Sequence, residues 1–106
     1  MDVSTTHRVD ASEPDAHGQY DYRYEYDIYR FSGGDIALVA RSYIHEADEA
    51  HFLRLEQNGK QRLLTDADLG LPLFAESVAY LKSHGKAKIN WLSGRGNGYE
   101  EVRLET

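Results

Sequence analysis

The sequence contains no cysteine, only two prolines and a single tryptophan among its 106 residues. Without cysteine the chain cannot form disulfides, thiolate metal sites or a cysteine nucleophile. No stretch approaches the roughly 20 apolar residues that a membrane-spanning helix needs. A chain of this length can build one modest hydrophobic core, so a single domain is expected.

Basic residues are also scarce: 12 Lys and Arg stand against 18 Asp and Glu, for a formal net charge of −6. Nucleic-acid binding starts from a basic surface, so no nucleic-acid partner is expected. Without a long apolar segment, no membrane partner is expected either. A basic protein partner suits this balance better. The first 19 residues are polar and acidic without an apolar segment, which does not fit a secretory signal. We therefore expect a cytoplasmic protein.

Four tyrosines alternate with charged residues at positions 20, 22, 24 and 26, in the run YDYRYEYD. Successive side chains of a β-strand point to opposite faces, so a strict period of two places all four rings on one face. On a helix the same residues would be scattered around the axis. The run therefore predicts a strand with one aromatic face and one charged face.

The chain is expected to divide into a disordered N-terminal arm (residues 1–18), which has no apolar periodicity, and a single α+β domain (residues 19–106). Residues 19–31 and 36–44 are β-rich and flank Gly33-Gly34, which suits a two-residue hairpin turn. If these glycines form the loop, Tyr26 lies opposite Arg41 and Tyr24 opposite Tyr43.

The remaining segments predict two more hairpins and one helix. Asn58-Gly59 and Asn97-Gly98 are strong hairpin signals, and the second would place Trp91 opposite Leu104. Residues 72–84 begin with proline, carry an apolar stripe and end before Gly85, as a helix does. The predicted fold is an antiparallel sheet of five or six strands, in the order β-β-β-β-α-β-β, with this helix packed on one face. The expected core comprises Leu53, Leu55, Leu64, Phe74, Val78, Leu81, Ile89, Trp91 and Val102.

One helix can cover only one face of a sheet, so the other face is a candidate contact surface. The aromatic face of the first hairpin supplies the expected partner-binding residues, which are Tyr22, Tyr24, Tyr26, Arg41, Tyr43 and His45. Tyrosine and arginine are enriched in interface hot spots. The competing interpretation is that these rings are covered by the helix or by the curl of the sheet.

Other patterns give weaker indications of chemistry. His45, Glu46 and His51 offer imidazole and carboxylate ligands for a divalent metal, but their spacing alone supplies no convergent geometry, and a solvated acidic turn is expected instead of a metal site. Arg95 lies in a glycine-rich loop that lacks the lysine and the following helix of phosphate-binding loops. No catalytic residue and no cofactor are indicated.

The function expected from these observations is a small, non-enzymatic protein-binding module, such as an adaptor, an inhibitor or an immunity-like protein. It would use the aromatic sheet face, with a protein partner or, in the simplest case, a homodimer. The alternative is a small-molecule or metal-binding domain, with or without enzymatic activity, that uses the tyrosine face together with His45, His51 and Arg95. A flat face favours a protein partner, whereas an enclosed pocket favours a ligand.

Overall fold

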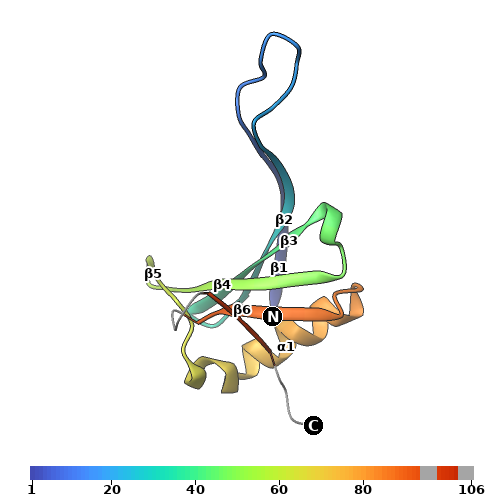
Figure 1. Cartoon of the computed structure of the whole chain (residues 1–106). Coiled ribbons are helices and arrows are strands. Elements are labelled where there is room, and N and C mark those ends of the chain that lie inside the picture. Colours follow the sequence, from blue (N-terminus) through green and yellow to red (C-terminus); the bar gives the residue numbers. More distant parts are fainter. Residues whose placement is uncertain (94–97, 103–106) are drawn as a thin grey trace.

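The computed structural model describes residues 1–93 and 98–102 and shows a seven-stranded, mostly antiparallel sheet with one main helix (Figure 1). The strand order is β1-β2-β3-β4-β6-β7, and β5 pairs with β4 outside this path. The strands are β1 (Asp2–Ala11), β2 (Arg23–Gly33), β3 (Ile36–Tyr43), β4 (Glu49–Gln57), β5 (Lys60–Arg62), β6 (Lys88–Leu92) and β7 (Tyr99–Glu101). The helix α1 spans Pro72–Ser83, and short 3-10 turns occupy Ile44–Glu46 and Asp66–Gly70. The predicted α+β class is confirmed.

Residues 2–11, which were expected to be disordered, form β1 and pair antiparallel with β2. This strand has no apolar alternation, and polar contacts across the hairpin take its place. His7 bonds to Asp27 at 2.7 Å and to Glu25 at 2.8 Å, and these hydrogen bonds raise the pKa of His7. The Tyr26 hydroxyl donates to Asp10 at 2.5 Å. Cross-strand pairs of this kind leave no hydrophobic signature in the sequence.

The predicted register of β2 and β3 is wrong by two residues. Gly33 pairs with Ile36, so the loop is Gly34-Asp35, and Tyr26 rather than Tyr24 lies opposite Tyr43. Gly34 takes the left-handed turn conformation at φ 62°. Gly33 stays in the strand, where an added Cβ would lie 3.2 Å from the Leu73 side chain. Because the slip is two residues, every side chain keeps its predicted face.

The predicted core is confirmed except at Leu53 and, in part, Val102. The pairing of β3 with β4 shifts between Val39 and Ala40, which leaves Leu53 as the extra residue of a bulge. Ala50, Phe52 and Leu55 are therefore the buried β4 side chains, whereas Leu53 is half-buried. Val102 is only partly buried against the core.

The C-terminal strands add the one parallel pair in the described sheet. β6 pairs parallel with β4, because the chain returns from β4 through α1 as a crossover connection. β7 then pairs antiparallel with β6, with Trp91 opposite Glu100. The predicted pairing of Trp91 with Leu104 is therefore wrong, and Leu104 itself lies outside the described residues.

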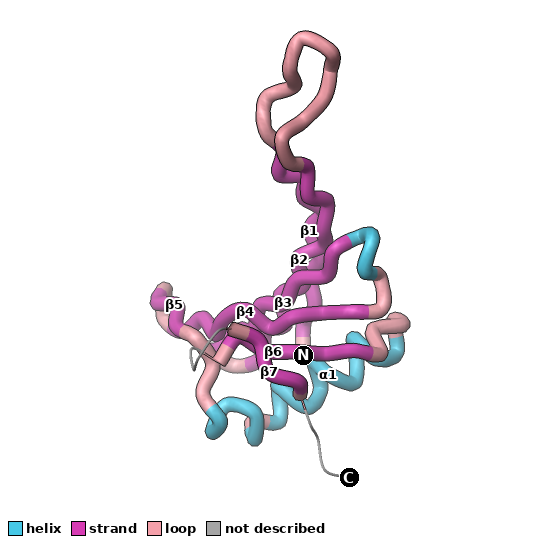
Figure 2. The backbone as a smooth tube through the Cα atoms, viewed as in Figure 1, coloured by secondary structure: helices cyan, strands magenta, loops and turns pink. Residues whose placement is uncertain are grey.

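The helix packs on the sheet face that carries Tyr29, Phe31 and Phe52, where the rings of Phe52 and Phe74 lie 4.7 Å apart. Of the helices in the described residues, none has the length and apolar character needed to cross a bilayer. The tyrosine face of β2 and β3 is the opposite one. The distal end of the β1–β2 hairpin projects well beyond the body of the sheet (Figure 2).

Candidate functional site

A contiguous cluster of aromatic rings extends from Arg41 along the sheet face that α1 does not cover. Its members, here called the tyrosine cluster, are the six residues predicted to bind a partner, which are Tyr22, Tyr24, Tyr26, Arg41, Tyr43 and His45. The structure brings all six together. The role assigned to them stays a prediction.

The rings form a continuous chain of contacts. Tyr22 stacks on Tyr24 at a centroid distance of 5.9 Å, and Tyr24 lies 6.0 Å from Tyr43. Tyr43 also meets Tyr26 edge-to-face at 5.7 Å and His45 at 5.9 Å. These are favourable separations for aromatic pairs. Each ring is thus held by a neighbour while part of its surface remains available.

Arg41 lies at the inner end of this chain. Its guanidinium carbon is 4.8 Å from the centroid of Tyr43 and 5.8 Å from that of Tyr26, both within cation–π range. One terminal nitrogen donates to the Tyr99 hydroxyl at 3.1 Å. The Arg41 Nε is buried and has no acceptor within the described part of the chain. No ion pair to Arg41 occurs among the described residues.

The exposure of the tyrosines separates the outer from the inner part of the cluster. Tyr22 and Tyr24 are 50% and 49% exposed, whereas Tyr26 and Tyr43 are half-buried. The hydrogen bond to Asp10 raises the pKa of Tyr26 above its ordinary value. The phenol therefore remains a protonated donor at neutral pH.

A second group of side chains adjoins the cluster beyond Arg41. Glu46, Glu49 and His51 each offer a ligand atom, and these atoms lie within 4.8 Å of one another. Burial lowers the pKa of His51, which favours the neutral imidazole that metals bind. Lys88 already approaches Glu49 at 3.8 Å, and His45 packs on Tyr43 instead of joining the group.

The sequence prediction missed two residues of this region, Tyr99 and Glu49. Tyr99 lies 4.7 Å from the His51 ring and contacts Arg41 because β6, paired parallel with β4, places β7 nearby. No local sequence signal reports such a pairing. Arg95, named for the alternative function, lies outside the described residues.

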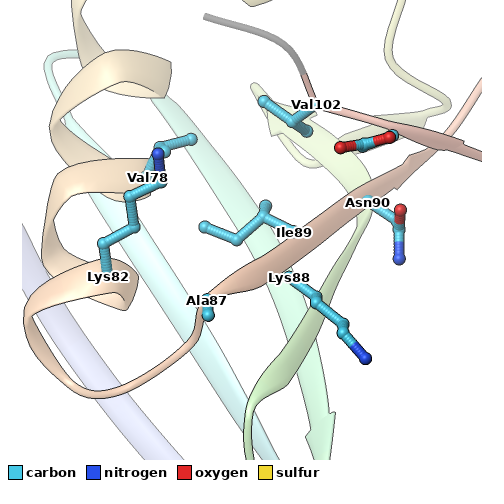
Figure 3. A pocket seen from close by; sticks show the side chains of 8 residues that line it. Val78, Lys82, Ala87, Lys88, Ile89, Asn90 and Val102 are labelled. Atoms are coloured by element: carbon cyan, nitrogen blue, oxygen red, sulfur yellow. The ribbon is translucent and has the colours of Figure 1, made fainter.

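The helix side of the sheet has a separate hollow of about 420 Å³ between α1 and the strands β6 and β7 (Figure 3). Lys82, Lys88 and Glu101 are its charged lining residues, and Val78 and Ile89 are apolar ones. It includes no member of the tyrosine cluster, and its lining contains no histidine or hydroxyl nucleophile among the residues that the structure describes.

Comparison with protein-family models, with curated proteins and with solved structures finds no match to this chain. The function is therefore inferred from the chemistry of these surfaces.

Proposed function

We propose that this chain is a small, non-enzymatic protein-binding module that acts in the cytoplasm and binds its partner through the tyrosine cluster. The observation that carries the proposal is a chain of mutually packed, partly exposed tyrosine rings around Arg41 on the open face of the sheet. A cysteine-free chain is consistent with that compartment.

The energetics of binding favour such a surface. Tyrosine and arginine are enriched among interface residues whose truncation costs the most binding energy. Tyr24, Tyr26 and Tyr43 are already held by neighbouring rings, so less side-chain freedom is lost on association. Preorganised aromatic area of this kind supports an adaptor, an inhibitor or an immunity-like protein.

The charge around the outer tyrosines supports a basic partner. Residues 10–24 carry four acidic side chains and one basic one, a formal net charge of 1 − 4 = −3. None of these four carboxylates forms an ion pair with a described residue. A basic surface placed against this segment would gain attraction without breaking an existing ion pair.

The convergence of Glu46, Glu49 and His51 favours a second candidate, a metal-binding or small-molecule-binding domain. Glu46 is exposed and Glu49 already faces Lys88, so the cluster lies at the edge of an open surface rather than in an enclosed pocket. This geometry supports the second candidate less well than a protein-binding surface.

The double variant Tyr24→Ser/Tyr43→Ser is expected to weaken partner binding by more than about 1 kcal/mol while the fold survives. The partner is captured from the source cells at a series of concentrations of this chain. The apparent affinity obtained from this titration measures the loss. Glu76→Ser/Ala79→Ser on the exposed side of α1 is the matched control, and it should bind as wild type.

Two results would count against the proposal. If the tyrosine double variant unfolds, the rings belong to the structural core. If it folds and captures the same partner with unchanged affinity, the binding surface lies elsewhere.

A further inference from the structure

The body of the sheet carries a shallow depression of about 450 Å³ that shares Arg41 with the tyrosine cluster. Arg41, Arg54 and Arg62 line it, together with apolar side chains from four different segments. These apolar residues are Leu53, Leu63, Leu92 and Tyr99. We call this surface the arginine depression.

The arginine depression has an excess of positive charge although the whole chain is acidic. Arg62 is balanced by a bidentate pair with Asp68. Arg54 shares the single carboxylate of Glu56 with Arg30. Arg41 has no carboxylate partner among the residues that the structure describes, and its buried Nε has no acceptor there.

Apolar side chains that line the depression are also exposed. Leu63 is 43% exposed and Tyr99 is 45% exposed. An occupant that combines negative charge with aromatic or apolar area therefore matches both properties of the surface.

The projecting end of the β1–β2 hairpin has that chemistry. Residues 10–24, here called the acidic arm, carry Asp10, Glu13, Asp15 and Asp21 against Arg23 alone. Tyr20, Tyr22 and Tyr24 lie on the same segment, each about half exposed. The tip of the arm extends away from its own sheet and helix (Figure 1), and residues 13–24 are all exposed.

We propose that the acidic arm of one copy of this chain docks in the arginine depression of a second copy. The inference rests on the proposed function, because the arm carries the outer tyrosines of the cluster, and it names a second copy as the partner. Each copy offers one arm and one depression. A two-fold arrangement therefore forms both contacts at once, as closed dimers do.

Charge reversal tests this pairing, with the association state measured by sedimentation at concentrations up to about 1 mM, the weak end of specific binding. The wild type should be dimeric. Arg41→Glu, which reverses the charge at the one arginine of the depression that has no carboxylate partner among the described residues, should weaken the dimer at least tenfold. Glu13→Lys/Asp21→Lys, which makes the arm basic, should have the same effect. Neither arm carboxylate accepts a hydrogen bond from a described residue, so the arm variant should keep its turn.

Complementation separates lost contact from lost fold. A mixture of the two variants should form a heterodimer, and the triple variant in one chain should recover the homodimer, because both contacts again join opposite charges. Glu76→Lys on α1 is the control and should leave the dimer unchanged. If Arg41→Glu fails to fold, Arg41→Gln removes the charge and should still weaken association.

A monomeric wild type, or a dimer that the arm variant leaves intact, overturns the second-copy proposal. Failure of complementation between folded variants overturns it as well. The proposed function is tested separately, by the capture of another protein. If the wild type is monomeric while Tyr24→Ser/Tyr43→Ser still abolishes capture of another protein, the protein-binding function stands and only the second copy is wrong.

Discussion

Replacing Phe74 by alanine should lower the free energy of unfolding by about 3–5 kcal/mol, the usual cost of such core truncations. Phe74 is fully buried, and its ring lies 4.7 Å from that of Phe52, so the change removes contacts between α1 and the sheet. Urea denaturation followed by the fluorescence of the buried Trp91 measures the loss.

Glu76→Ala is the matched control for this variant, because Glu76 is exposed on the same helix. It should change the free energy of unfolding by no more than about 0.5 kcal/mol. A Phe74→Ala midpoint equal to that of the wild type would show that α1 packs on the sheet by another face.

Replacing Asp68 by asparagine should lower the free energy of unfolding by about 2 kcal/mol at neutral pH. Asp68 is buried, and its carboxylate accepts bonds from Arg62 at 2.6 and 2.9 Å and from the Thr65 backbone N–H at 2.7 Å. The Arg62 pair, helped by Thr65, lowers the pKa of Asp68 to about 2 against the opposing effect of burial.

The same variant should lose part of the acid sensitivity of the fold. A depressed pKa in the folded state gives stability that is present above the unfolded value of about 3.9 and is lost as the pH falls towards 2. The free energy of unfolding of the wild type should therefore fall more steeply between about pH 4 and pH 2 than that of Asp68→Asn. Parallel curves for the two proteins would contradict the ion pair.

The sequence was sufficient to predict elements whose signals are local. The tyrosine alternation predicted β2, although the strand begins at Arg23 and not at residue 19, so Tyr20 and Tyr22 precede it. Asn58-Gly59 predicted the β4–β5 turn, and Pro72 with Gly85 bounded α1. Each of these signals acts through backbone conformation or side-chain periodicity within a few residues.

Features that depend on distant pairing could not be predicted in this way. β1 is held by side chains such as His7, whose acidic partners lie far along the chain. Gly33 lies in the strand, where the Leu73 side chain of α1 leaves little room for a Cβ. The prediction that Gly33 and Gly34 together form the turn was therefore wrong. The bulge at Leu53 likewise reverses an alternation that would otherwise predict the core face.

In the candidate site, too, residues with local sequence signals were predicted and residues placed by distant pairing were not. Its tyrosines lie on one hairpin, and a slip of two residues leaves them on one face, as period-two alternation requires. Tyr99 contacts Arg41 only because β4 and β6 pair in parallel. Glu49, and not His45, lies beside His51. The turn at Ile44–Glu46 places His45 against Tyr43 instead.

On the proposed function, the tyrosine face rather than the helix face contacts a protein. A photo-crosslinking amino acid placed at position 24 or at position 79, in living cells, tests this claim most directly. Both positions are exposed, and they lie on opposite sides of the sheet. The account predicts discrete protein adducts from position 24 that disappear when Tyr43→Ser is added, and none from position 79. Equal adducts from both positions, or adducts from position 79 alone, would contradict it.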